Sequence, residues 1–202
     1  MKYRKFTIIF STLLACTIII FLFNPFSQSS EEKDYFAIID LDVNDLNKKD
    51  MDIFIEESEY FNLLTSIQMK NVNNNDGIEF FVQIDNPSTL LKDVKITVHL
   101  NEKLKNIFHT DQLFISNNPH YTTLEPNGES KGLSVAKLFF PLPEDQLLDV
   151  DFSKNEIYDL LTDIKIKVSW TDKLGEEIIQ YIKPEQSRIE IDSKAIDLLA
   201  NF

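Results

Sequence analysis

The sequence is poor in several residue types that common catalytic and nucleotide-binding motifs require. Its 202 residues include one cysteine, four glycines and three histidines, and its 20 lysines and arginines are outnumbered by 33 aspartates and glutamates. The single cysteine, Cys16, lies in an apolar stretch near the N-terminus, so no disulfide bond can join two parts of this chain. Stability must therefore come from burial of an ordinary hydrophobic core.

The scarcity of glycine argues against two kinds of active-site loop. Phosphate-cradling loops need closely spaced glycines, and a serine nucleophile elbow needs the pattern Gly-x-Ser-x-Gly. Neither pattern occurs among the four glycines, which are Gly77, Gly128, Gly132 and Gly175. All four fall at expected turns or strand ends, so we expect them to allow the backbone conformations of those turns. We therefore expect that the chain is not an enzyme and that it binds no cofactor.

The histidines and acidic clusters do not form a recognisable metal site. His99, His109 and His120 lack the paired spacing of a zinc motif, and no cysteine ligand accompanies them. His99 alternates with apolar residues of an expected strand, so we expect its side chain to face away from the core. We expect no metal ligands.

One acidic stretch begins like a calcium-binding loop. Residues 40–44 read Asp-x-Asp-x-Asn, but the sixth position is Asp45, where a calcium loop needs glycine, and the twelfth is Met51, where it needs glutamate. An ordinary solvated acidic segment is the better interpretation.

Basic residues are also too few to make a surface for nucleic acid. Residues 31–202 carry all 33 acidic residues and 17 basic ones, a net charge of −16. Nucleic acid binding needs clustered lysine and arginine that displace counterions from phosphates, whereas here these residues are scattered among carboxylates. We therefore expect no nucleic-acid partner.

The most informative feature that is present is a long uncharged run at the N-terminus. Residues 6–23 form 18 uncharged residues that follow Lys2, Arg4 and Lys5. A helix of this length reaches about 27 Å at about 1.5 Å per residue, close to the hydrocarbon thickness of a bilayer. The charge asymmetry predicts a transmembrane helix with its N-terminus in the cytoplasm and the rest of the chain outside.

Three fates of this segment remain open. It can be retained as a membrane anchor, since it is longer than the apolar part of most cleaved signal peptides. It can be cleaved after Ser29, because Ser27 and Ser29 provide small residues at alternate positions. It can also be lipidated at Cys16, because residues 13–16, Leu-Leu-Ala-Cys, resemble the lipobox of bacterial lipoproteins.

The sequence divides into four regions. Residues 1–5 form a basic cytoplasmic N-terminus, residues 6–23 the anchor or signal segment, residues 24–59 an acidic stalk and residues 60–202 a single extracytoplasmic domain. Within the stalk, Asn44 or Asp45 can cap a helix over roughly 46–57. Leu46, Ile53 and Phe54 would give that helix an apolar stripe for docking on the domain.

Alternation of apolar and polar residues predicts a mostly β domain. It is clearest over 78–84, 94–100 and 164–170, and weaker candidate strands are 63–72, 112–116, 133–140, 178–182 and 188–191. Turn residues at 73–77, 86–88, 125–128 and 172–175 separate the strands. A capping-box pattern at Ser153–Glu156 predicts one helix over 154–161. The predicted fold class is all-β, an antiparallel sandwich with one or two short helices, preceded by one transmembrane helix.

The order of these segments resembles the immunoglobulin-like modules of exported bacterial proteins. The resemblance rests on the Asn86-Pro87-Ser88 turn and on segments 93–98, 124–130 and 168–172, and it covers about residues 63–191. It implies an immunoglobulin-like β-sandwich, a fold that serves many functions.

Two phenylalanine pairs provide the best indication of a contact surface. Successive strand residues face opposite sides, so one member of each pair at 80–81 and 139–140 should be exposed unless another element covers it. We expect Phe81 and Phe139 to contribute to a protein-contact surface. The resulting prediction is a single-pass protein of the bacterial cell envelope whose outer domain is a non-catalytic interaction module with an envelope or membrane protein partner. The alternative is a secreted or lipid-anchored domain that binds carbohydrate or another ligand, as an accessory to a hydrolase.

Overall fold

The computed structural model describes residues 46, 48–108, 110, 112–117, 122–126, 128, 132–143 and 152–200, which belong to a compact unit spanning residues 39–202. The expected transmembrane helix at 6–23, Cys16, Ser29 and the Asp-x-Asp-x-Asn stretch lie outside the described residues. Within the described part of the chain, no helix is long and apolar enough to cross a membrane.

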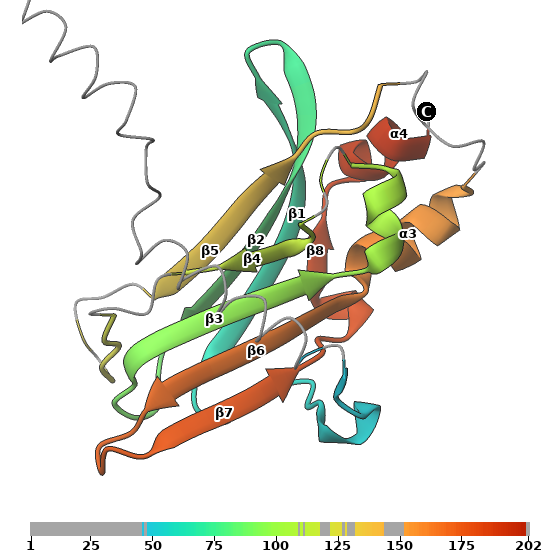
Figure 1. Ribbon diagram of the computed structural model, residues 1–202. Coiled ribbons are helices and arrows are strands. Elements are labelled where there is room, and N and C mark those ends of the chain that lie inside the picture. Colours follow the sequence, from blue (N-terminus) through green and yellow to red (C-terminus); the bar gives the residue numbers. More distant parts are fainter. Residues whose placement is uncertain are drawn as a thin grey trace, which may run out of the picture. The chain divides into compact units, whose positions relative to one another are not determined.

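The described residues form two four-stranded sheets that share one core (Figure 1). The first sheet has the order β5 (Leu133–Phe139), β2 (Asn75–Asp85), β1 (Asn62–Val72) and β8 (Ile189–Ile191). The second has the order β4 (Phe114–Ser116), β3 (Lys92–Leu100), β6 (Ile164–Thr171) and β7 (Glu177–Ile182). All neighbouring strands are antiparallel except β1 and β8. The prediction of a mostly β, antiparallel-rich sandwich with few short helices is confirmed.

Alternating side chains build the core between the sheets. In β6 the buried residues Ile164, Ile166, Val168 and Trp170 alternate with partly exposed ones. The inward residues of β2 and β3 complete the same cluster. Burial of each large apolar side chain stabilises the fold by about 1.5–3 kcal/mol, which explains why period-two patterning specifies this sandwich without disulfide bonds.

A tight turn joins β1 to β2. Val72 pairs with Asn75, so the loop consists of Asn73 and Asn74, whose φ angles are 53° and 65°. Two successive positive φ angles are the geometry of a type I′ turn, which asparagine tolerates better than most residues. β5 pairs with β2 only over 78–84, so the tip of this hairpin extends past its neighbour in the sheet (Figure 1).

Two α-helices pack against each other next to the sheets (Figure 1). α3 (Lys154–Thr162) begins with the predicted capping box: the Ser153 side chain accepts from Glu156 N, and the Glu156 carboxylate accepts from Ser153 N. α4 (Ser193–Ala200) follows β8 and buries Ala195 and Leu199. The sequence analysis did not predict α4.

The segment expected as a helix over 46–57 takes another conformation beyond Asp50. Met51–Ile53 form a single 3₁₀ turn, η1, and the chain is extended at Phe54. Ile55 then adds to the edge of β7: its N–H donates to Tyr181 O (3.0 Å), and its carbonyl accepts from Lys183 N (2.9 Å). The free edge of β7 gives the backbone N–H and carbonyl of Ile55 hydrogen-bond partners, as a helix would have done. Local sequence does not show that this edge lies nearby.

An inward-facing lysine links the edges of the two sheets. Lys137 of the edge strand β5 pairs with Phe80, and its Nζ donates to the carbonyl oxygens of Gln112 (3.1 Å) and Phe114 (3.4 Å). Nζ also lies 5.0 Å from the centre of the Phe139 ring. Burial lowers the pKa of Lys137. A charge pointing inward from an edge strand disfavours addition of a further strand there.

Candidate functional site

Phe139, predicted to be exposed, is a core residue. It is 3% exposed, stacks on Phe108 with ring centres 5.4 Å apart and meets Phe80 edge-on at 5.6 Å. Its pairing with Ile78 places it on the inward face of β5. The expectation that one member of the pair is exposed holds for Phe140, which is 40% exposed, so the choice of Phe139 was wrong.

Phe81 lies on the outer face of the first sheet and is half-buried. It pairs with Ser66 of β1 on one side and with Ala136 of β5 on the other. Together with neighbouring apolar residues it forms what we call the outer apolar strip. The strip consists of Leu64, Phe81, Ala136, Leu138 and Phe140. Leu64 and Phe140 are its most exposed large members, at 37% and 40%.

Gly77 gives two members of the outer apolar strip room to lie against the sheet. A Cβ atom at this position would stand 3.0 Å from Leu138 Cδ1, 3.2 Å from Phe140 Cδ1 and 2.9 Å from the Phe139 carbonyl oxygen. These distances are too short for a side chain, so glycine here permits the close approach. The strip therefore has a defined local geometry at its Phe140 end.

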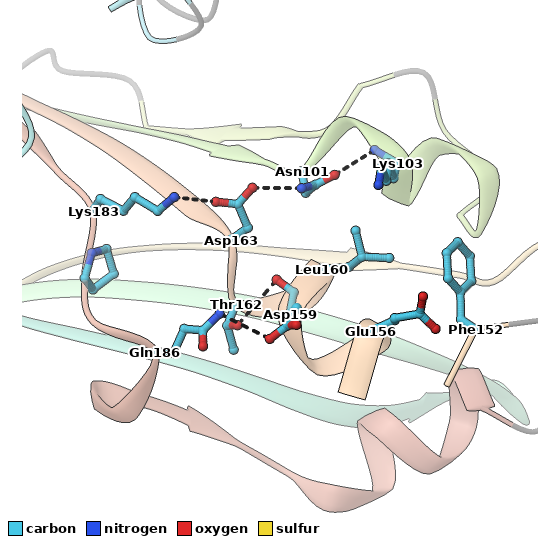
Figure 2. A pocket seen from close by; sticks show the side chains of 11 residues that line it. Asn101, Lys103, Phe152, Glu156, Asp159, Leu160, Thr162, Asp163, Lys183 and Gln186 are labelled. Atoms are coloured by element: carbon cyan, nitrogen blue, oxygen red, sulfur yellow. Dashed lines mark hydrogen bonds and ion pairs between the residues drawn. The ribbon is translucent and has the colours of Figure 1, made fainter. Parts of the chain in front are cut away.

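An open pocket lies beside α3 (Figure 2), and none of its lining residues belongs to the outer apolar strip. It has a volume of about 410 Å³. Its walls come from the end of β3, from α3 and from the chain that follows β7. The lining residues are Asn101, Lys103, Phe152, Glu156, Asp159, Leu160, Thr162, Asp163, Lys183, Pro184 and Gln186. The site combines apolar and polar groups on a concave surface, as ligand sites commonly do.

A charged network crosses one wall of this pocket (Figure 2). Asp163, at the C-terminal end of α3, accepts a hydrogen bond from Asn101 Nδ2 (2.7 Å) and pairs with Lys183 Nζ (2.8 Å). Asn101 in turn accepts from Lys103 N (2.9 Å). Burial raises the pKa of Asp163, but the hydrogen bonds from Lys183 and Asn101 and the lysine charges outweigh burial, so the net pKa is lowered. The carboxylate thus joins three segments that are distant in the sequence.

His99 faces away from the sandwich core, as expected, yet it is only 5% exposed. Its Nε2 lies 2.8 Å from Glu102 Oε1, and Glu102 also forms an ion pair with Lys105. Burial lowers the pKa of His99, and this effect outweighs the hydrogen bond and charge of Glu102, which raise it. Facing away from the core therefore does not expose His99 to solvent, because the position of a residue in a strand fixes the direction of its side chain but not what covers that side chain.

Several other predicted features lie outside the described residues, namely Cys16, His109 and His120. Among the residues the structure does describe, no group of three or more histidines, cysteines, aspartates or glutamates is arranged to hold a metal ion.

The pocket was not found from the sequence, for a physical reason. Asn101 and Asp163 meet although 62 positions separate them, and only the antiparallel register of β3 and β6 brings them together. The sequence gives only a weak indication of the pocket, which is that Asn101 and Asp163 each directly adjoin a strand rich in apolar residues.

Comparison of the sequence with protein-family models finds no match, and comparison with curated proteins finds no significant relative.

Proposed function

We propose that this chain is a membrane-anchored protein of the bacterial cell envelope, with a non-catalytic interaction module outside the membrane. The observation that carries the proposal is the outer apolar strip on the first sheet. Exposed apolar surface of this kind is costly in water unless a partner covers it, and contiguous apolar patches commonly mark protein-contact sites.

The chemistry of the strip and of the whole chain indicates the kind of partner. Phe81 and Phe140 provide aromatic surface, and aromatic residues are enriched where protein interfaces are most buried. The chain beyond the leader has a net charge of −16, so a partner with a neutral or basic rim is favoured over an acidic one. We propose an envelope or membrane protein that presents an apolar patch within such a rim.

The strand order supports an immunoglobulin-like assignment for the module. The first sheet contains the order β1-β2-β5 and the second β3-β6-β7. Read as strands A-B-E and C-F-G, these match the sheet orders of immunoglobulin-like sandwiches. On this assignment β8 and α4 are C-terminal additions, and α3 lies in the connection between strands E and F.

The uncharged run at residues 6–23 supports the proposed location at the cell membrane. Its 18 uncharged residues suffice for a span, and the positive charges lie on its N-terminal side. In the proposal residues 6–23 remain in the membrane and the sandwich faces outward.

A second candidate function rests on the pocket beside α3. Phe152 together with amide, ammonium and carboxylate groups could bind a sugar or another small polar ligand. In that case the chain would be a secreted or lipid-anchored binding domain, released after Ser29 or lipidated at Cys16.

Fractionation of producing cells, followed by intact mass measurement, tests the anchored form. We expect the protein in the membrane fraction, with residues 6–23 still present in the measured mass. Recovery from the medium with a mass that begins at residue 30 would contradict the anchor and support the secreted alternative. A lipid-modified chain beginning at Cys16 would instead support the lipoprotein form.

A further inference from the structure

The pocket beside α3 has charges of opposite sign on two sides. Glu156 and Asp159 belong to α3, whereas Lys103 belongs to η2, the 3₁₀ helix Glu102–Asn106 that follows β3. Figure 2 shows Lys103 on one side of Leu160 and the two carboxylates on the other side. An occupant of the pocket would therefore meet an ammonium group on one side and carboxylates on the other.

The other two charged groups of the pocket, Asp163 and Lys183, neutralise each other. Lys183 Nζ lies 2.8 Å from Asp163 Oδ1, and Asn101 Nδ2 donates to Asp163 Oδ2 (2.7 Å). These contacts fix one wall of the pocket and use both carboxylate oxygens. Recognition of charge in an occupant must therefore come from Lys103, Glu156 and Asp159.

These three groups are available to another molecule. The ammonium group of Lys103 has no hydrogen-bond or ion-pair partner among the residues that the structure describes. The Asp159 carboxylate has one weak contact, from Gln186 Nε2 at 3.5 Å. Glu156 accepts from Ser153 N (2.9 Å) and Ser153 Oγ (2.7 Å) through Oε2 alone, so its Oε1 can accept from an occupant.

Lys103 and Glu156 act on each other across open space. Hydrogen bonds from Ser153 lower the pKa of Glu156, and the charge of Lys103 adds to this effect, so the carboxylate is ionised at neutral pH. No ion pair joins the two side chains in the described part of the chain. The pocket volume of about 410 Å³ falls within the range of about 300–1,000 Å³ that is usual for small-molecule sites.

The surface between the charged groups is apolar. Leu160 is 8% exposed, and the half-buried Phe152 packs against the hydrophobic core next to it. Both side chains line the pocket. An apolar group placed over them would leave water, which favours binding.

We infer that this pocket binds a small zwitterion with an apolar body, the chemical class to which free leucine belongs. The ammonium group of the ligand lies near Glu156 and Asp159, its carboxylate accepts from Lys103, and its apolar body covers Leu160 and Phe152. A neutral sugar would hydrogen-bond to the charged groups without neutralising them. A ligand with a single charge would neutralise one side only.

The inference rests on the second candidate function, because it names the ligand class of the same pocket. It depends on neither the outer apolar strip nor the membrane anchor.

NMR titration of the isotope-labelled full chain in a non-ionic detergent, near neutral pH, tests the inference with four probes. Leucine carries both charges, leucinamide only the ammonium group, N-acetyl-leucine only the carboxylate, and glucose neither. We expect leucine to shift the amide signals of α3 and η2 with a dissociation constant in the millimolar range or tighter. It should bind at least about tenfold more tightly than each of the other three probes, a difference of about 1.4 kcal/mol.

Two variants separate the two sides of the pocket. K103Q should weaken leucine binding at least about tenfold and leave leucinamide binding unchanged. E156Q/D159N should also weaken leucine binding and leave N-acetyl-leucine binding unchanged, and glutamine at 156 still suits the capping box. K173Q and E176Q/E177Q make the same charge changes at exposed positions in and after the β6–β7 turn and should bind leucine normally. Unchanged β2 and β6 signals verify that each variant is folded.

The outcomes distinguish the ligand class from the function. Equal affinity for leucine and either singly charged analogue, or leucine binding that K103Q leaves unchanged, would overturn the inference. Tighter binding of glucose than of leucine at α3 and η2 would overturn it as well, while supporting the second candidate function as a sugar-binding domain. No shift at α3 and η2 with any probe would overturn both the inference and the second candidate function.

Discussion

At the scale of single residues, Phe139 and Phe140 show how strongly one position in a strand changes the role of a side chain. Phe139 packs among Phe80 and Phe108 in the core, whereas its neighbour is 40% exposed beside Gly77. The sequence shows two adjacent phenylalanines and requires one of them to face out. Only the register with β2, in which Phe139 pairs with Ile78, decides which one does.

Alanine substitutions at these two positions should differ greatly in their effect on stability. F139A removes a buried aromatic ring and leaves a cavity, so we expect it to lower the free energy of unfolding by about 3–5 kcal/mol. F140A removes a partly exposed ring and should cost less than about 1 kcal/mol. Urea denaturation measures both values. Equal losses in the two variants would contradict the assigned burial.

The buried His99 should make stability depend on pH. Because burial lowers its pKa in the folded protein below the ordinary value of 6.5, the unfolded chain binds this proton more readily. The contribution of neutral His99 is therefore complete above about pH 6.5 and declines as the pH falls from there through the folded-state pKa. Glu102, Lys105 and Lys165 are the charged groups acting on this histidine.

The matched experiment compares the unsubstituted chain with H99Q by denaturation at pH 7.5 and pH 5.5. The chain with His99 should lose more stability over this interval than H99Q does. The carboxylates of Glu102 and Asp163, whose pKa values are lowered, titrate below this interval and should not contribute to the difference. An identical pH dependence in the two proteins would exclude the proposed role of His99.

At the scale of elements, the alternation of apolar and polar residues predicted the strands correctly but did not predict the segments outside the strands. All eight candidate strand segments correspond to strands β1 to β8 in the described residues, because burial on one face imposes a period of two. The helix expected over 46–57 does not continue beyond Asp50. Ile55 pairs instead with Ile182 at the edge of β7. Such competition between local and long-range pairing is not visible in local sequence.

The missed helix α4 had a local signal. Asp192 precedes it and its side chain accepts from Lys194 N (3.0 Å), as a helix-capping residue does. Ala195 and Leu199 then follow at helical spacing, and both are buried. The pocket beside α3 had a much weaker signal, because its walls come from three separate segments that meet only in the folded chain.

Substitutions in the Asn73–Asn74 turn test how much this one turn contributes to the stability of the protein. Both residues have positive φ angles, which glycine adopts without the steric cost of a Cβ atom. We expect N74G to raise the free energy of unfolding by about 0.5 kcal/mol and N74V to lower it by about 1 kcal/mol or more. Thermal and urea denaturation measure the free energy of unfolding of both variants. Equal free energies of unfolding for N74V and N74G would contradict the assigned turn geometry.

At the scale of the whole molecule, the two outer sheet faces have different chemistry. The first carries the outer apolar strip, which we propose binds a partner. The second carries outward-facing lysines, and residues Phe54 and Ile55 of the described stalk lie against β6 and β7. These two features lie on opposite faces of the same sandwich.

Site-specific photo-cross-linking in intact cells tests the central claim most directly. A photoreactive residue replaces Phe81 or Phe140 on the outer apolar strip, or Leu174 as a control. Leu174 is 76% exposed in the turn between β6 and β7, away from the strip. The account predicts that the Phe81 and Phe140 positions form an adduct with the same envelope or membrane protein and that the control does not. Normal expression and localisation with no adduct at either strip position, or the same adducts at Leu174, would contradict it.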